Sequence, residues 1–472
     1  MKKGMAVMLA GLKRKLAAGV AVMTVVMTPM AASAESLTDA LVAAYKHSGL
    51  LEQNRALLRA ADEDVAVAVA ALRPIINYAL SASYTDPTTV APNDDYFGAS
   101  ATLSADLVLY DFGRSQLGID LAKETVLATR EALVTVEQSV LLVAVAAFMD
   151  VRTAIDSIAL QTNNVRLITQ ELRAANDRFE VGEVTQTDVS QAEARLAAAR
   201  AAEAAAQGQL MIAREAYRAA TGHYPGPLST PPAPPMAAKT LDAAKGIARR
   251  THPDMLRAQR EVTIAELSVQ VALSTMKPTL SGAASMTLST GGQVDTESRR
   301  TQLGVTLSGP LYQGGKLSAL YRRALAQADA TRANLHVVRL TIDQNVGTAW
   351  AQLAIARAQI EATDRQIRAS RVALRGAREE ASLGARTTLD VLNAEQELLD
   401  AEDARISAQS DQYLATYSLL RSMGLLTADH LRLGIPTYDP TAYYNAVSGA
   451  PTHQVSPQGE KLDAVLKALG RQ

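Results

Sequence analysis

The 472-residue sequence has no cysteine and few aromatic residues. Without cysteine there can be no disulfide framework, no thiolate-ligated metal, no thiol nucleophile and no cysteine-linked lipid. Aromatic residues make up 4% of the chain, with a single Trp, so several thick globular cores cannot be filled. The apolar fraction of 48% is carried largely by Ala, Leu and Val, which suits long helices that approach one another closely.

Histidine is also scarce, with six residues spread along the chain. His252 and His430 have no partner residues at metal-ligand spacing, and we expect both to be solvated surface side chains. The acidic stretch from Glu395 to Asp403 is most simply interpreted as the solvated face of a helix. We therefore expect no metal site and no cofactor.

Residues 1–34 are typical of a signal peptide. They contain five basic residues, which are Lys2, Lys3, Lys13, Arg14 and Lys15. An apolar stretch at 16–27 and a cleavage pattern at 32–34 follow, so we expect the mature chain to start at Glu35. Loss of the five basic residues leaves 42 basic and 48 acidic residues, and such an acidic exported chain is a poor candidate for nucleic-acid binding. No later segment suggests a membrane-spanning helix of about 20 apolar residues.

The rest of the chain contains an internal duplication. Residues 37–74 align without gaps with 241–278, and after a shift of two residues the match continues to Gly222 and Gly424. A constant offset over so long a stretch predicts two copies of one fold. We therefore divide the chain into four parts after the signal: a first repeat at 35–224, a Pro-rich linker at 225–239, a second repeat at 240–424 and a C-terminal tail at 425–472.

Both repeats predict the same order of helices. A first helix of about 35 residues, at 36–72 and 240–276, ends at a proline. After two strands comes a very long helix, from Gly113 to about residue 180 and from Gly315 to about residue 382. About 67 residues at 1.5 Å each extend roughly 100 Å, far more than a globular domain needs. A glycine-centred turn and a return helix complete each repeat.

Alternation of apolar and small polar residues predicts strands at about 75–86 and 96–110, and again at 279–290 and 300–311. A transmembrane barrel requires strands of this length and pattern, although a soluble hairpin with one face on a core would look the same. Four strands cannot close a barrel, and lipid does not tolerate open sheet edges. Some oligomer must complete the barrel, and three chains would supply 12 strands.

Two motifs resemble the signatures of the TolC family of outer-membrane efflux proteins. Residues 309–316, Gly-Pro-Leu-Tyr-Gln-Gly-Gly-Lys, together with Ala349-Trp350, resemble the second-repeat signature, and residues 108–114 its first-repeat counterpart. The resemblance covers nearly all of residues 36–424. It implies a mixed α and β membrane protein, a homotrimer with a 12-stranded barrel in outer-membrane lipid and a long periplasmic α-helical barrel. It also implies a passive duct, not an enzyme, engaged by a periplasmic adaptor protein and an inner-membrane pump.

The glycine turns at the far ends of the long helices are the candidate functional site. Thr185 to Asp188 and Thr387 to Asp390 each fit a capping box. The resemblance implies that Asp188 and Arg386 link neighbouring coils of a closed entrance, and that Asp390 of three copies forms a carboxylate ring, which would select cations. We expect adaptor contacts at the turns, namely at Gly182, Glu183, Val184, Thr185, Gly384, Ala385, Arg386 and Thr387.

Two residues depart from the family pattern at this entrance. Asn393 stands where a second acidic ring would lie, and Ala381 stands where an aromatic latch residue would lie. The entrance is therefore expected to be less acidic and less tightly latched.

Three functions fit these features. A duct for type I protein secretion is favoured, because the turn sequences resemble that branch and no cysteine is present for a lipid anchor. A duct for small-molecule or multidrug efflux shares all the visible chemistry. A soluble periplasmic coiled-coil adaptor or scaffold would need no barrel strands. The tail after Gly424 loses periodicity, so it either wraps the helices or is partly disordered.

Overall fold

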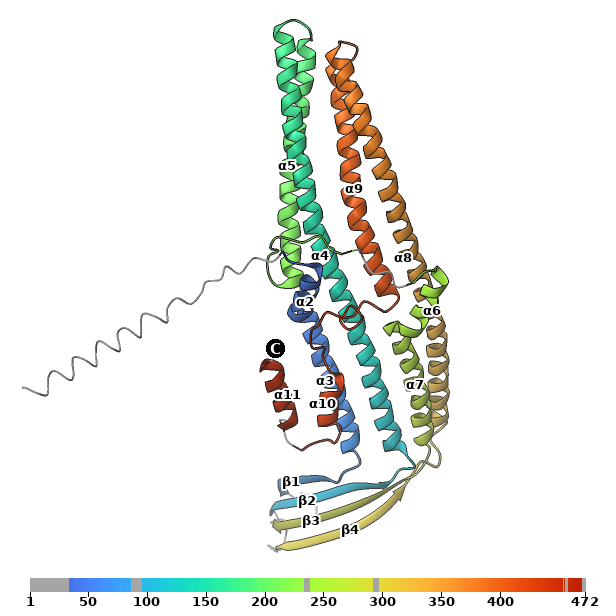
Figure 1. The fold of residues 1–472 in the computed structure, drawn as a ribbon. Coiled ribbons are helices and arrows are strands. Elements are labelled where there is room, and N and C mark those ends of the chain that lie inside the picture. Colours follow the sequence, from blue (N-terminus) through green and yellow to red (C-terminus); the bar gives the residue numbers. More distant parts are fainter. Residues whose placement is uncertain are drawn as a thin grey trace, which may run out of the picture.

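The computed structural model describes residues 34–85, 96–232, 238–291, 297–452, 454 and 457–468. The predicted signal peptide up to Ser33, residues 86–95 and the middle of the Pro-rich linker lie outside the described residues. Figure 1 shows an elongated molecule with a β-sheet at one end and the turns of two helical hairpins at the other.

The two repeats have matching helices. In the first repeat they are α2 (Leu37–His47), α3 (Gly49–Ala70), α4 (Arg114–Glu180) and α5 (Gln186–Thr221). In the second repeat they are α6 (Leu241–Thr251), α7 (Pro253–Ser274), α8 (Lys316–Ser382) and α9 (Thr388–Ser422). Both α4 and α8 contain 67 residues, which corresponds to about 100 Å. The tail adds α10 (Pro440–Val447) and α11 (Pro457–Ala468).

The prediction of one continuous first helix in each repeat was wrong. The backbone is extended at Ser48, which separates α2 from α3, and at His252, which separates α6 from α7. In the second repeat the cause is Pro253, because a proline disfavours helical geometry in the residue before it. In the first repeat the Ser48 hydroxyl accepts a hydrogen bond from the Leu51 amide and so caps a new helix.

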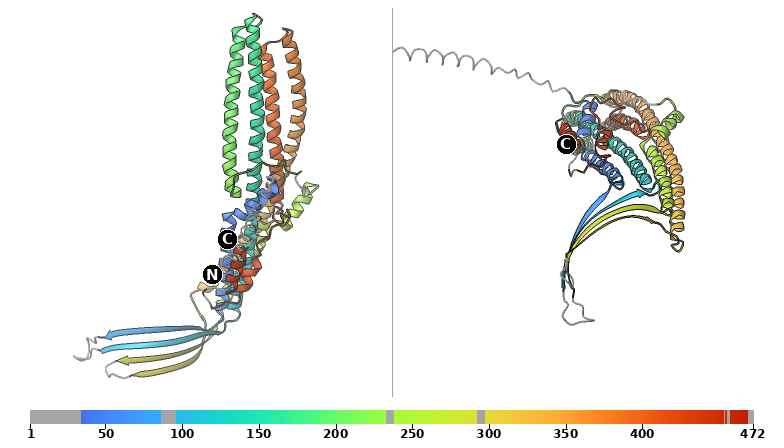
Figure 2. Two further views of the ribbon diagram at one scale, coloured as in Figure 1. Left: turned by 60° about the vertical axis from the view of Figure 1, so that its left-hand side comes forward. Right: turned by 90° about the horizontal axis from the view of Figure 1, so that it is seen from below.

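The four strands form one antiparallel sheet in the order β1-β2-β3-β4. The strands are β1 (Ile75–Thr85), β2 (Tyr96–Tyr110), β3 (Thr279–Gly291) and β4 (Ser298–Ser308). Figure 2 shows the sheet curving away from the helical body. The two repeats therefore meet inside the sheet, where β2 pairs with β3.

The register of the sheet sorts apolar and polar residues onto opposite faces. Tyr78 lies opposite Leu103 and Leu103 opposite Met286, so large apolar residues share one face. On the other face, Ser81 bonds to Ser100 at 2.8 Å and Ser289 to Ser298 at 2.7 Å, between hydroxyl oxygens. The alternation read from the sequence is confirmed by this register.

The apolar face is not covered by the rest of the described chain. Tyr78 is 81% exposed, Leu80 75% and Leu303 79%. A soluble hairpin packed on its own core would bury such residues, so that interpretation does not hold for the described chain. Within the same described residues, β1 and β4 each pair on one side only, which leaves two sheet edges with unpaired backbone groups.

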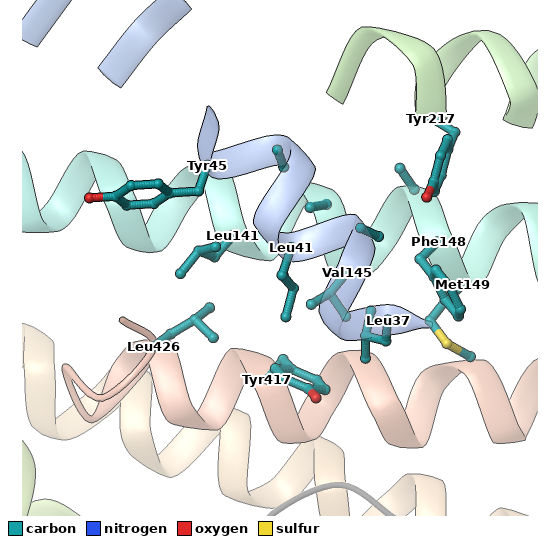
Figure 3. Packing of buried hydrophobic residues seen from close by; sticks show 14 of the residues in the cluster. Leu37, Leu41, Tyr45, Leu141, Val145, Phe148, Met149, Tyr217, Tyr417 and Leu426 are labelled. Atoms are coloured by element: carbon teal, nitrogen blue, oxygen red, sulfur yellow. The ribbon is translucent and has the colours of Figure 1, made fainter. Parts of the chain in front are cut away.

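The largest apolar core lies midway along the molecule. Side chains from α2, α4, α5 and α9 meet there, as Figure 3 shows for Leu41, Phe148, Tyr217 and Tyr417. The cluster includes an apolar stretch of α4 that by length and composition could cross a membrane, contrary to the expectation that the sequence has no such segment. Leu141, Val145 and Phe148 of α4 are fully buried against the other helices, so part of this stretch is core, and 39% of its most apolar window is buried.

The tail wraps along α3 and α4 towards the sheet. Arg73, beside the start of β1, donates hydrogen bonds to the carbonyls of Gly449 and Ala450. Arg130 of α4 bonds the Pro440 carbonyl at 3.3 Å, and Tyr443 bonds the Glu63 carboxylate at 2.8 Å. The sequence allowed a tail that wraps the helices or one that is partly disordered. The described residues of the tail wrap the helices.

Candidate functional site

The candidate site is the pair of turns that join α4 to α5 and α8 to α9, at the end of the molecule opposite the sheet (Figure 1). Gly182 and Gly384 have φ values of 81° and 75°, a region that favours glycine. The amide of Glu183 bonds back to the carbonyl of Arg178, and the amide of Ala385 to that of Glu380, both at 2.9 Å. The chain reverses its direction over very few residues in each turn, so glycine is required there.

Both predicted capping boxes are confirmed. The Asp188 carboxylate accepts bonds from the Thr185 amide at 2.9 Å and hydroxyl at 2.7 Å, and Asp390 accepts the same bonds from Thr387 at 3.0 and 2.8 Å. The pKa of Asp188 is lowered mainly by the hydrogen bond with the Thr185 side chain. The pKa of Asp390 is lowered mainly by the hydrogen bond with the Thr387 backbone. Both turns therefore carry an ionised carboxylate at neutral pH.

Arg386 lies between the two acidic groups of its own turn. Its Nε donates to the Glu380 carboxylate, and both side chains are about half exposed. Hydrogen bonding to Glu380 raises the pKa of Arg386, and the charge of Arg386 contributes to the lowered pKa of Asp390. Within one chain the partner of Arg386 is thus Glu380, and a pairing with Asp188 of another copy stays a prediction.

The residues predicted to contact an adaptor form two exposed loops. Gly182, Glu183 and Thr185 are exposed and Val184 is half-buried, while all four second-repeat positions, 384–387, are exposed. Beside them Val181 is 72% and Leu383 83% exposed. Each turn thus presents a large apolar side chain together with charged and small polar groups.

A few turns of helix from these loops, the structure corrects one prediction and adds new contacts. Glu395 is buried rather than part of a solvated face, and it pairs with Arg378 of α8. Nε of Arg378 also lies 3.3 Å from Oε1 of Glu171 on α4. Burial is the main cause of the raised pKa of Glu395, and the negative charge of Glu171 raises this pKa further. Asn393 accepts a hydrogen bond from Arg195 of α5 at 3.1 Å.

The sequence contained a signal for the buried position of Glu395. On α9 it follows Val391 by four residues and Thr388 by seven, and both of these are buried. Helical spacing therefore places Glu395 on the packed stripe of the helix, despite its charge.

His252 is also buried rather than solvated, which corrects a second prediction. Its Nδ1 accepts a hydrogen bond from the Asp254 amide at 3.1 Å and so caps α7. Burial lowers the pKa of His252. Among the described residues, no three side chains of metal-ligand type come together.

Comparison with known proteins assigns this architecture to a family. The model of the family described as "Outer membrane efflux protein" matches residues 40–223 and 246–425. The outer membrane efflux protein BepC of Brucella suis is 36% identical over 439 residues, which cover 92% of this chain and 95% of BepC. The alkaline protease secretion protein AprF of Pseudomonas aeruginosa is 27% identical over 376 residues, covering 75% of this chain and 76% of AprF.

The fold also matches a solved structure of the channel CusC. Its TM-score is 0.73 at 19% identity, covering 82% of this chain and 92% of the CusC chain. The soluble adaptor or scaffold considered above is therefore wrong, because the matched family consists of channels of the outer membrane. These channels are transport conduits rather than enzymes. With both repeats inside the matched ranges, the chain belongs to the TolC-type family of outer membrane efflux proteins.

Proposed function

We propose that three copies of this chain form an outer-membrane duct for type I protein secretion, working with a periplasmic adaptor and an inner-membrane pump. The observation that carries the proposal is the sheet, with its exposed apolar face and two unpaired edges. Lipid accepts such a sheet only when further copies supply the missing partners, and three copies close a barrel of 12 strands. The helices then continue the duct by about 100 Å across the periplasm.

The entrance of the duct is proposed to lie at the glycine turns. Asp390 of three copies would form a ring of ionised carboxylates, supported by its capping bonds and lowered pKa. Arg386, which is half exposed, can reach a neighbouring copy when it releases Glu380, and Asp188 is its proposed partner there. Ion pairs as exposed as these are screened by water and are weak, so three of them form a latch that a partner can open.

The same turns are the proposed adaptor contacts. Their exposed apolar residues, Val181 and Leu383, lie at the tip of each hairpin, where a partner would cover them. The duplication gives each copy two similar contact sites, so a trimer would present six.

Two observations bear on the substrate. The absence of cysteine, and hence of a lipid anchor, and the name of the relative AprF, a protease secretion protein, favour protein export. The more similar relative BepC is named an efflux protein, which favours a duct for small toxic compounds. Protein secretion is our proposal, and efflux is the second candidate.

The proposal is tested in two steps. Membrane fractionation followed by gel electrophoresis should find the chain in the outer membrane as an SDS-resistant trimer; a freely soluble monomer would refute the duct. A deletion strain should then lose a secreted protein while keeping its growth on toxic compounds. Increased sensitivity with an unchanged set of secreted proteins would instead establish the efflux function.

A further inference from the structure

We propose that Arg300 of three copies forms a basic ring inside the barrel, at the end of the duct opposite the entrance, and that this ring favours anions and binds multivalent ones. The inference rests on the proposed duct, because only further copies turn one face of the sheet into a lumen. It concerns the barrel, and it is separate from the carboxylates at the turns.

Two neighbouring arginines near the start of β4 lie on opposite faces of the sheet. Arg299 is opposite Leu288, and Arg300 is opposite Thr287. Thr287 is in turn opposite Thr102, and the hydroxyl oxygens of these two threonines are 3.1 Å apart. Arg300 therefore lies on the polar face of the sheet and Arg299 on the apolar face.

The polar face is the one that lines the lumen of a closed barrel. Lipid covers the other face, whose large residues, such as Leu303, are mostly exposed in the single copy. Each copy thus presents Arg300 to the lumen and Arg299 to the lipid. Arg299 is the second residue of β4, so its long side chain can extend to the headgroups at the rim of the barrel.

Arg300 lies at the end of the sheet farthest from the helices. It is the third residue of β4, which ends at Ser308 and leads towards α8 (Figure 1). The eight positions from Arg300 to Ser308 span about 27 Å at about 3.4 Å each. The glycine turns with Asp390 are at the opposite end of the molecule. Three copies would therefore carry carboxylates at one opening of the duct and guanidinium groups at the other.

Few other charges lie in the barrel strands. Besides Arg299 and Arg300, the residues of the four described strands include one charged side chain, that of Asp106 on β2. Asp106 is on the polar face, opposite Ala283, which is four positions along β3 from Thr287 and so about 14 Å from the level of Arg300. Arg300 is exposed and forms no hydrogen bond or ion pair with any described residue. Its charge therefore acts on ions in the lumen.

The barrel is narrow enough for the charge of the ring to reach its axis. In a barrel of 12 strands, spaced about 4.8 Å apart and tilted by about 40°, the backbone lies roughly 12 Å from the axis. Arginine side chains extend inward from the backbone, so each guanidinium comes within one Debye length of the axis, which is about 10 Å at 0.1 M salt. Three such charges attract anions and repel cations. A multivalent anion is attracted more strongly than chloride, because the attraction grows with its charge.

Arg300→Gln is the variant that tests the ring, and Arg299→Gln is its matched control. Both remove an arginine charge from neighbouring positions of β4, but only the first removes it from the lumen. The control also removes a contact on the apolar face, where Nη2 of Arg299 lies 3.4 Å from Sδ of Met286. Each full-length variant is inserted into planar bilayers in a potassium chloride gradient, and the reversal potential gives the permeability ratio of chloride to potassium. Inorganic pyrophosphate is then added to each side in turn, and the block of the current is recorded.

We expect Arg300→Gln to lower the permeability ratio of chloride to potassium about threefold at 0.1 M salt and hardly at all at 1 M, where the Debye length is about 3 Å. Arg299→Gln should keep the wild-type ratio, and Arg300→Lys, which keeps the charge, should restore most of it. Pyrophosphate added on the side away from the helices should block wild-type channels, and this block should be severalfold weaker in Arg300→Gln.

A wild-type permeability ratio in Arg300→Gln, an equal change in Arg299→Gln, or the absence of block by pyrophosphate would overturn the ring. All variants should remain SDS-resistant trimers, which separates loss of charge from loss of assembly. If the wild-type protein itself forms no channels, the proposed duct fails instead.

Discussion

The middle of the molecule and its turn end are held together in different ways. At the middle, apolar side chains of α2, α4 and α5 from the first repeat share one core with Tyr417 and Leu420 of α9 from the second. Near the turns, each hairpin has its own apolar cluster, and the hairpins touch through Arg378, Glu171, Arg195 and Asn393. Separation in the middle would expose apolar surface, whereas separation near the turns exchanges polar contacts for water.

This difference indicates where the molecule can move. A buried apolar core gives way only with global unfolding, so the middle is a fixed joint. Charge pairs that are partly exposed have a smaller net free energy and can be replaced by contacts with a partner. The two hairpins of one chain are thus attached rigidly at the middle of the molecule, and their turn ends can move apart.

The largest expected effect comes from damaging the fixed joint. Phe148 is fully buried in the core of the middle, and Phe148→Ala should lower the free energy of unfolding by about 3 to 5 kcal/mol through lost burial and a cavity. Val143→Ala on the same helix removes an exposed side chain and should change it by about 0.5 kcal/mol or less. Thermal unfolding in detergent, followed by circular dichroism, compares the two. Equal losses would mean that the core does not hold the middle together.

A smaller effect should come from a buried carboxyl group on α3. Asp62 of α3 is fully buried, its two carboxylate oxygens have no hydrogen-bond partner, and burial raises its pKa to about 6. The folded chain therefore keeps a proton that the unfolded chain releases near pH 4, and Asp62 makes the protein less stable as the pH rises from 4 to 6. The expected loss is about 3 kcal/mol.

Asp62→Asn should flatten this part of the stability profile, measured by denaturant unfolding between pH 4 and pH 8. Asp64→Asn is the matched control, because the neighbouring Asp64 side chain is exposed. A profile for Asp62→Asn with the wild-type slope would show that this carboxylate does not hold the proton.

The smallest effect is expected at the turns. Arg386→Ala removes an exposed guanidinium whose ion pairs are screened by water, so the free energy of unfolding should hardly change. Single-channel conductance should nevertheless rise, because the proposed latch to Asp188 of the next copy is lost. Unchanged conductance would remove Arg386 from the gate.

The sequence was sufficient for features that follow from local pattern. Alternation located the faces of all four strands, and the glycine and Thr-Asp motifs located the turns with their capping boxes, because each of these depends on neighbouring residues only. The breaks at Ser48 and His252 were missed. In the second repeat Pro253 is a local signal for a break before it, although the sequence pattern predicted a continuous helix there.

Contacts between distant segments could not be predicted in the same way. The acidic run containing Glu395 suggests solvent, and the ion pair with Arg378 across the turn gives the burial of this carboxylate a physical reason. The docking of the tail through Arg73 and Tyr443 likewise joins residues more than 370 positions apart. Local patterns carry no information on such pairings, which depend on how the repeats pack.

The two unpaired sheet edges have a genetic consequence. Each copy would offer β1 to one neighbour and β4 to the other, so a subunit with a damaged β4 could still join a wild-type subunit through its intact β1. The resulting ring would contain two sound subunits and still be unable to close. Alleles that disrupt one edge should therefore be dominant over the wild type, whereas alleles that prevent the whole chain from folding should be recessive.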